Sequence, residues 1–249
     1  MKIKLFGLAI LAAGLSGMAS AAVINGASAF ASLNLSEISL TALSSSVTAS
    51  VLQFTDPTAY ANALGPVASS AQYGFGNSSA GAATSSSSSE ALALGNVLTA
   101  FAQTKNGSAF ANEQETLTFT LTGNGSEILT IPYALLSSSN GNNSWKQTGN
   151  SVATVGAYGN VAKNQSGSLF AEVTSQTGGV HSVADGSSLE FLLNNQGRSA
   201  TTYTFDLGAS AQAFYSGTPA PVPEVPASLM LSLGLLPLAS RRGRKILGL

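Results

Sequence analysis

The stretch Thr116-Leu-Thr-Phe-Thr-Leu-Thr-Gly-Asn-Gly-Ser-Glu-Ile-Leu-Thr-Ile131 carries the clearest structural signal in the chain. In its first half, large apolar residues alternate with threonines, which is the pattern of a strand with one buried face. The dipeptide Asn124-Gly125 that follows is typical of a tight turn. The stretch therefore predicts a hairpin in which the strand Leu117–Leu121 pairs with the strand Glu127–Ile131.

Similar alternation recurs along the chain, with Gly, Asn and Ser between the segments at spacings near ten residues. Further strands are expected at 33–40, with a bulge where the alternation changes phase, and at 46–54, 152–158, 168–175, 188–193 and 201–215. No long amphipathic helix is visible. These features predict an all-β body, either a sandwich or a jelly roll.

Three segments are less clearly determined. Asp56-Pro57 resembles a helix start and Gly65 a helix stop, so a short helix is expected from Pro57 to Leu64. Residues 66–90 are rich in Ser, Ala and Gly, which fits a flexible loop, thin strands or a glycan-bearing segment. Residues 91–103 fit either a helix or a strand.

The charge is distributed unevenly over the 249 residues. Without its two ends the chain carries four basic and eleven acidic side chains, a net charge of about −7. Such a body has no electrostatic footprint for nucleic acid, so no nucleic-acid partner is expected. The chain contains no cysteine, which excludes cysteine nucleophiles, thiolate metal sites and lipidation at an N-terminal cysteine.

The N-terminus has the three parts of a secretory signal peptide. Lys2 and Lys4 precede an apolar run, and Ala19-Ser20-Ala21 offers the small side chains that signal peptidase requires before Ala22. We therefore expect residues 1–21 to be removed during export, leaving an exported β-rich domain at 22–216.

The C-terminus also has three parts in a fixed order. A Pro-rich linker at 217–226 contains the motif Pro223-Glu224-Val225-Pro226, and an apolar segment follows. A basic cluster then closes the hydrophobic tail at 227–249; its members are Arg241, Arg242, Arg244 and Lys245. Such a tail is expected to enter the membrane as a helix and to keep its basic end on the cytoplasmic side.

This tail, roughly the last 29 residues, resembles the PEP-CTERM sorting signal of exported bacterial proteins, in which Pro-Glu-Pro precedes a hydrophobic segment and an Arg-rich end. It departs from that signal in having Val225 at the third position, with Pro226 next, and in the four residues 246–249 after the basic cluster. The resemblance implies an exosortase-like membrane enzyme as partner, transient inner-membrane anchorage and release at the cell surface. A plain C-terminal anchor is the alternative.

Catalytic candidates are sparse. The single histidine, His181, is followed by Ser182 and later by Asp185 and Asp206, but no Gly-x-Ser-x-Gly elbow accompanies them. One histidine and no cysteine are too few ligands for zinc. We therefore expect no catalytic, cofactor or metal site.

Two neighbouring carboxylates allow a second hypothesis. Glu113 and Glu115 would project to one side of a strand, as a general acid and base would, but a solvated strand edge is the commoner role for such a pair. Glu113 with Asn112 could bind calcium weakly, although no EF-hand spacing is present.

The placement of the aromatic residues would distinguish a carbohydrate-binding protein from a surface or matrix protein without a binding site. Trp145, Tyr133 and Tyr158 could form a stacking platform for sugar rings, although core packing is the commoner role. The sequence favours a non-catalytic surface or matrix protein associated with exopolysaccharide. The alternative is a secreted carbohydrate-binding module or a weakly marked glycan-active enzyme. Aromatic rows exposed on one sheet, or carboxylates facing each other across a cleft, would favour that alternative.

Overall fold

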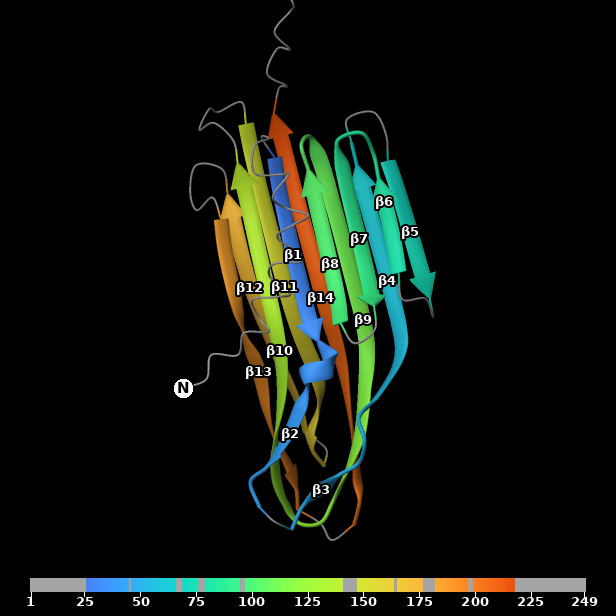
Figure 1. Ribbon diagram of the computed structural model, residues 1–249, viewed down its shortest axis with the longest axis vertical. Helices are drawn as coiled ribbons and strands as arrows, with labels where there is room; N and C mark the ends of the chain where they lie inside the picture. Colours follow the sequence, from blue (N-terminus) through green and yellow to red (C-terminus); the bar gives the residue numbers. More distant parts are fainter. Residues whose placement is uncertain are drawn as a thin grey trace, which may run out of the picture. The chain divides into compact units, whose positions relative to one another are not determined.

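The computed structural model describes residues 26–44, 46–65, 69–75, 79–94, 97–140, 147–163, 165–176, 182–196 and 199–217. These residues form strands almost throughout, so the all-β prediction is confirmed (Figure 1). The elements are β1 (Gly26–Asn34), the 3-10 helix η1 (Leu35–Glu37), β2 (Ser39–Ala42), β3 (Thr48–Ala49), β4 (Gln53–Leu64), β5 (Ser69–Phe75), β6 (Ser79–Ala83), β7 (Ser87–Leu94), β8 (Val97–Thr104), β9 (Gly107–Thr122), β10 (Gly125–Asn140), β11 (Gln147–Ala162), β12 (Gln165–Gln176), β13 (Ser182–Asn195) and β14 (Thr201–Gly217).

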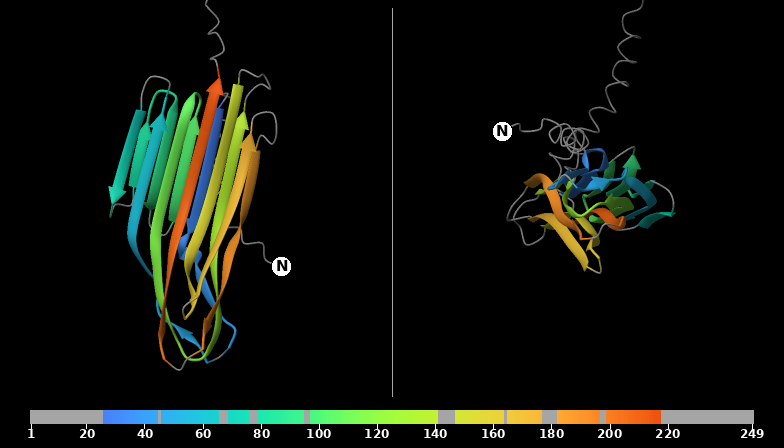
Figure 2. Two further views of the ribbon diagram at one scale, coloured as in Figure 1. Left: turned by 180° about the vertical axis from the view of Figure 1, so that it is seen from behind. Right: turned by 90° about the horizontal axis from the view of Figure 1, so that it is seen from below.

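The strands form one sheet that folds back on itself into two facing layers. The first layer runs β12-β11-β14-β9-β4-β5 and the second β13-β10-β1-β8-β7-β6. They are joined by a single parallel bridge between Ala162 and Asn194, and every other pairing is antiparallel. β14 lies over β1 and β8, as the front and back views both show (Figures 1 and 2). The result is a nearly closed, sandwich-like sheet.

The predicted hairpin is wrong. β9 pairs with β4 and β14 in the first layer, whereas β10 pairs with β1 and β13 in the second. The alternation of Leu117, Phe119 and Leu121 correctly marks a buried face, but it cannot specify which strand lies alongside. The turn at Gly123-Asn124 carries the chain from one layer to the other, so the two apolar faces meet across the interior instead of lying side by side.

A short crossing segment occupies the strand edges beside this turn. β2 pairs with β10, and β3 pairs with β9, so residues 39–44 and 46–49 lie along an edge of each layer beside the turn. The Ser46 hydroxyl donates to the carbonyl oxygen of Asn124 at 2.6 Å. Gly123 has a φ of +99°, and a Cβ there would lie 1.9 Å from the Ser46 carbonyl oxygen. Only glycine fits this close approach.

The helix expected from Pro57 to Leu64 is a strand. Ala59, Ala61 and Ala63 are buried at period two within β4, which pairs with both β5 and β9. The register shifts between Thr55 and Thr58, and Asp56 has a φ of +56°. The Asp-Pro dipeptide therefore marks a β-bulge rather than a helix start.

The remaining ambiguous segments are also strands. Residues 66–90 contain β5, β6 and the start of β7, and residues 91–103 lie in β7 and β8, so the strand alternatives are confirmed for the described residues. The phase change after Leu35 is η1 rather than a bulge, and Asn34 caps it by accepting a hydrogen bond from the Ser36 amide at 3.2 Å.

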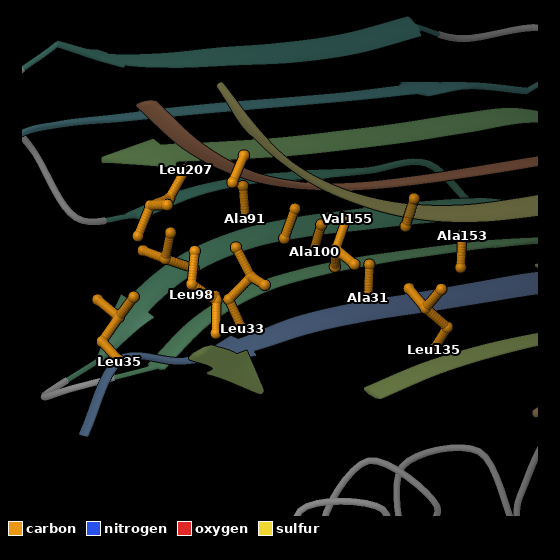
Figure 3. Packing of buried hydrophobic residues seen from close by; sticks show 14 of the residues in the cluster. Ala31, Leu33, Leu35, Ala91, Leu98, Ala100, Leu135, Ala153, Val155 and Leu207 are labelled. Carbon is orange, nitrogen blue, oxygen red and sulfur yellow. The ribbon is translucent and has the colours of Figure 1, made fainter. Parts of the chain in front are cut away.

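The interior has two parts of different composition. The aromatic half is filled by large side chains at one end of the layers: Leu117, Phe119, Leu121, Leu129, Ile131, Leu189, Phe191, Leu193, Tyr203, Phe205 and Leu207. The alanine half is filled by small ones, among them Ala29, Ala31, Ala61, Ala63, Ala100, Ala102, Ala109, Ala111, Ala153, Ala211 and Ala213. Figure 3 shows Ala31, Ala100 and Val155 directed into the same interior space from three strands.

Several predictions lie outside the described residues. They are the signal peptide with Ala19, Ala21 and Ala22, the Pro-Glu motif, the hydrophobic tail with its basic cluster, His181 and Trp145. Within the described ranges, no helix has the length and apolar character needed to cross a membrane.

Candidate functional site

The outer face of the first layer carries an open hollow of about 430 Å³ over β12, β11, β14 and β9. Antiparallel register brings one residue of each strand into a row across its floor. Phe170 lies opposite Gly156, Gly156 opposite Gly208, and Gly208 opposite Gln114. Successive residues of a strand point to opposite faces of the sheet. Because the adjacent residues Ala157 and Leu207 are buried, this row lies on the outer face.

Two adjacent glycines create the hollow, and neither is required by the backbone. A Cβ on Gly156 would come no closer than 3.6 Å to another atom, and one on Gly208 no closer than 3.8 Å. Both distances are ordinary van der Waals contacts, and neither glycine has a positive φ. Glycine inside a strand weakens it and often marks a position where a ligand approaches the backbone. The clearest effect of these two glycines is the space above them.

Two aromatic side chains flank this floor. Tyr158 on β11 is 56% exposed, and Phe170 on β12 is 75% exposed. Tyr158 pairs with Ser168 while Phe170 pairs with Gly156, so the two side chains are diagonal neighbours on one face. Diagonal pairs lie about 7–8 Å apart, within reach of one flat ligand.

Polar groups line the other side of the hollow. Asp206 lies directly opposite Tyr158, and the Thr116 hydroxyl donates to Asp206 Oδ1 at 3.0 Å. This hydrogen bond orients the carboxylate, which retains further acceptor capacity. The exposed amide of Gln114 can both donate and accept. None of the described residues that line the hollow is basic.

The predicted Glu113–Glu115 edge is wrong, because β9 lies inside the first layer between β4 and β14. Glu113 points into the interior and is completely buried, and neither of its carboxylate oxygens has a hydrogen-bond partner among the described residues. Burial, together with the nearby Glu115, raises the pKa of Glu113 to about 8. Burial also raises the pKa of Glu115. Asn112 points to the opposite face, so Glu113 and Asn112 do not form a calcium site.

The proposed triad partners are not brought together. Asp206 lies on β14 in the first layer, and Asp185 lies on β13 in the second. Asp185 instead accepts a hydrogen bond of 2.9 Å from the Tyr133 hydroxyl. Burial and this neighbouring carboxylate raise the pKa of Tyr133 to about 12. No group of three or more His, Cys, Asp or Glu side chains within the described ranges is placed to hold a metal ion.

The predicted aromatic platform is also divided, since Tyr133 belongs to the second layer and Tyr158 to the first. Tyr158 was predicted from the sequence, whereas its neighbours in the hollow, Phe170, Gly156 and Gly208, were not. A signal for the two glycines was present, because Gly156 and Gly208 each interrupt a strand-like run two residues from an aromatic or acidic side chain.

Comparisons with known proteins identify no relative of this chain: no family model, curated protein or solved structure matches it.

Proposed function

We propose that the β-rich unit is a non-catalytic carbohydrate-binding protein that acts outside the cell. The observation that carries this proposal is the hollow, in which a floor of two glycines lies between two exposed aromatic side chains and a polar wall. Exposed aromatic side chains on one sheet face favour carbohydrate binding, and Tyr158 and Phe170 form an exposed diagonal pair on this face.

The chemistry of the lining suits a sugar. The C–H faces of sugar rings pack against aromatic faces, while their hydroxyls need donors and acceptors placed at the rim. Tyr158 and Phe170 provide the aromatic side chains, and Asp206 and Gln114 provide the polar groups. A few placed polar groups on an otherwise apolar surface are typical of small-ligand sites. The glycine floor lets a ring come close to the sheet.

The placement of the carboxylates supports binding rather than hydrolysis. Among the described residues, Asp206 is the only carboxylate that lines the hollow. The nearest other exposed carboxylates, Asp56 at the bulge of β4 and Glu172 on β12, do not line it. A glycosidase needs two carboxylates that flank the bond to be cleaved, and the lining of the hollow provides one.

The two chain ends support an extracellular role. We propose that residues 1–21 direct export and that the tail after Val225 is removed by an exosortase-like enzyme, releasing the protein into a polysaccharide matrix. The acidic body would disfavour anionic lipid surfaces once released. Mass spectrometry of the protein from its own cells tests this. A mature chain from Ala22 to about Val225 is expected, and an intact C-terminus at the cell surface would make the tail a plain anchor.

Filling the hollow tests the binding function. Gly156→Val should abolish binding, because the new side chain occupies the floor, while the β-branched residue leaves stability equal or higher. Gly186→Val on β13 is the matched control, since a Cβ there also meets nothing closer than 3.7 Å. Native electrophoresis in gels containing hydroxyethylcellulose provides the measurement. We expect retardation of the wild type and the control but not of Gly156→Val. Equal mobility of all three proteins with and without the polysaccharide would contradict the proposal.

A further inference from the structure

We infer that the binding site extends from the hollow across β9 to a second aromatic position on β4, so that its ligand is an extended chain of neutral sugars rather than a single sugar. This inference rests on the proposed carbohydrate-binding function. The observation behind it is a separate one: a second aromatic pair lies on the same outer face, beyond the hollow.

The second position is formed by Tyr60 on β4 and Phe110 on β9. Both are partly exposed, and their ring centroids lie 5.8 Å apart with an interplanar angle of 50°. Asn62 Nδ2 donates to the Tyr60 hydroxyl oxygen at 3.0 Å, which fixes the ring in place. Alternation puts both residues on the outer face, because Ala59, Ala61 and Ala111 beside them are buried.

Register gives the path between the two positions. Gly208 lies opposite Gln114, and one row further on Ser210 lies opposite Asn112, which itself lies opposite Tyr60. Two strand spacings and two residues of rise give about 12 Å from Gly208 to Tyr60. One sugar ring does not cover this distance, but a short oligosaccharide does.

The side chains along this path are uncharged. Asn112, Gln114 and Ser210 each offer an amide or a hydroxyl, and these groups bind sugar hydroxyls without selecting for charge. The charged side chains near this path, among the described residues, are the carboxylates of Asp206, of Glu172 and of Asp56, which is exposed at the bulge of β4; all three are acidic and would repel a uronic-acid polymer. The ligand class is therefore a neutral polysaccharide. A chain that follows one face of a sheet must itself be extended, as β-1,4-linked hexose chains are.

The test is the dependence of affinity on ligand length. Cellobiose, cellotetraose and cellohexaose are titrated calorimetrically into the wild-type protein and into Tyr60→Ala, Tyr60→Phe and Gly208→Val. We expect the wild type to bind the hexasaccharide at least about tenfold more tightly than the disaccharide, as the loss or gain of one aromatic contact implies. Tyr60→Ala should remove this advantage without changing disaccharide affinity. Tyr60→Phe should keep it, and Gly208→Val should bind neither ligand.

The outcomes separate the two proposals. If Gly208→Val abolishes binding but Tyr60→Ala leaves the length dependence intact, the extended site is wrong and the hollow alone binds sugar. If no oligosaccharide binds the wild type, the neutral β-1,4 chain is wrong as the ligand. Analytical sedimentation of the same proteins tests whether this face instead binds a second copy of the chain. A wild-type dimer that Gly208→Val dissociates would show that it does, and would contradict the extended sugar site. Unchanged thermal unfolding of Tyr60→Ala confirms that its effect is local.

Discussion

The two halves of the interior hold the same layers together by different means. In the aromatic half, Phe119 stacks on Tyr203 and on Phe205, with centroids 5.6 Å and 6.3 Å apart. In the alanine half, the corresponding positions further along the same strands are Ala111, Ala211 and Ala213. β9 and β14 therefore change from large to small inward residues along their length.

This difference changes the source of stability. Burying one large apolar side chain contributes about 1.5–3 kcal/mol, whereas alanine has little side chain to bury. The alanine half also contains buried hydroxyls, and Ser137, Ser151 and Ser175 hydrogen-bond to one another at 2.8–3.1 Å. The aromatic half supplies most of the hydrophobic free energy. The alanine half depends on close backbone approach and on satisfied polar groups.

The largest effect is expected at the boundary between the halves, where Glu113 lies. Its in-register neighbours Ala209 and Ala59 offer no positive charge. Below pH 4.5 both the folded and the unfolded protein keep this carboxyl protonated, so it causes no loss. Between pH 4.5 and about 8 only the unfolded chain releases the proton, so stability falls as pH rises, by an upper limit of about 5 kcal/mol.

Urea unfolding measured from pH 4 to pH 9 checks this. Glu113→Gln should flatten most of the slope, and a smaller slope of the same sign should persist, because burial also raises the pKa values of Glu115 and Glu127. A wild-type protein that becomes more stable between pH 5 and pH 8 would show that Glu113 is ionised when folded.

The second prediction concerns the centre of the aromatic half. Phe119 is fully enclosed, so Phe119→Ala should lower the free energy of unfolding by about 3–5 kcal/mol through lost burial and the cavity left behind. Thr118→Ala, one residue away on the outer face, is the control and should cost less than about 1 kcal/mol. Chemical denaturation followed by circular dichroism measures both, and a loss from Thr118→Ala as large as that from Phe119→Ala would contradict the burial of Phe119.

The same contrast explains how far the sequence predicts the structure. Alternation identified the buried face wherever large residues carry it, as in Leu117–Leu121 and in the strand 201–215. Where alanine and serine carry it, as in β4 to β7, the apolar contrast is too small to separate strand from loop or helix. Even in the clearest segment the sequence did not reveal which strands pair. The turn at Gly123-Asn124 allows the two flanking strands to lie in different layers as readily as it allows them to pair with each other. The hollow depends on register across four strands, which no local pattern specifies.

A third prediction tests the packing of the alanine half. Ala211 on β14 is completely buried, with Ala111 and Ala153 as its in-register neighbours. Ala211→Leu adds volume where the facing layers leave no room, and it should cost about 1–3 kcal/mol even though the residue becomes more apolar. Gln212→Leu on the outer face is the control and should change stability by less than about 0.5 kcal/mol. A gain in stability from Ala211→Leu would show that small side chains leave unfilled space in this half.

The smallest effect is expected in the serine cluster, and the cost per residue depends on how many hydroxyls are removed. Ser151 Oγ contacts both Ser137 and Ser175 and also reaches the Ser138 carbonyl oxygen at 3.0 Å. Ser151→Ala should therefore cost about 1 kcal/mol, because the two remaining hydroxyls lose a shared partner in a buried place.

Replacing all three serines by alanine should cost less than the sum of the three single changes, because no buried hydroxyl is then left without its partner. Ser216→Ala, on the exposed face of β14, is the control and should be nearly neutral. Thermal unfolding of the four variants and the triple variant gives the comparison. Strictly additive losses would mean that each hydroxyl is satisfied independently by backbone groups, and the alanine half would then hold its layers by backbone contacts rather than by a connected polar cluster.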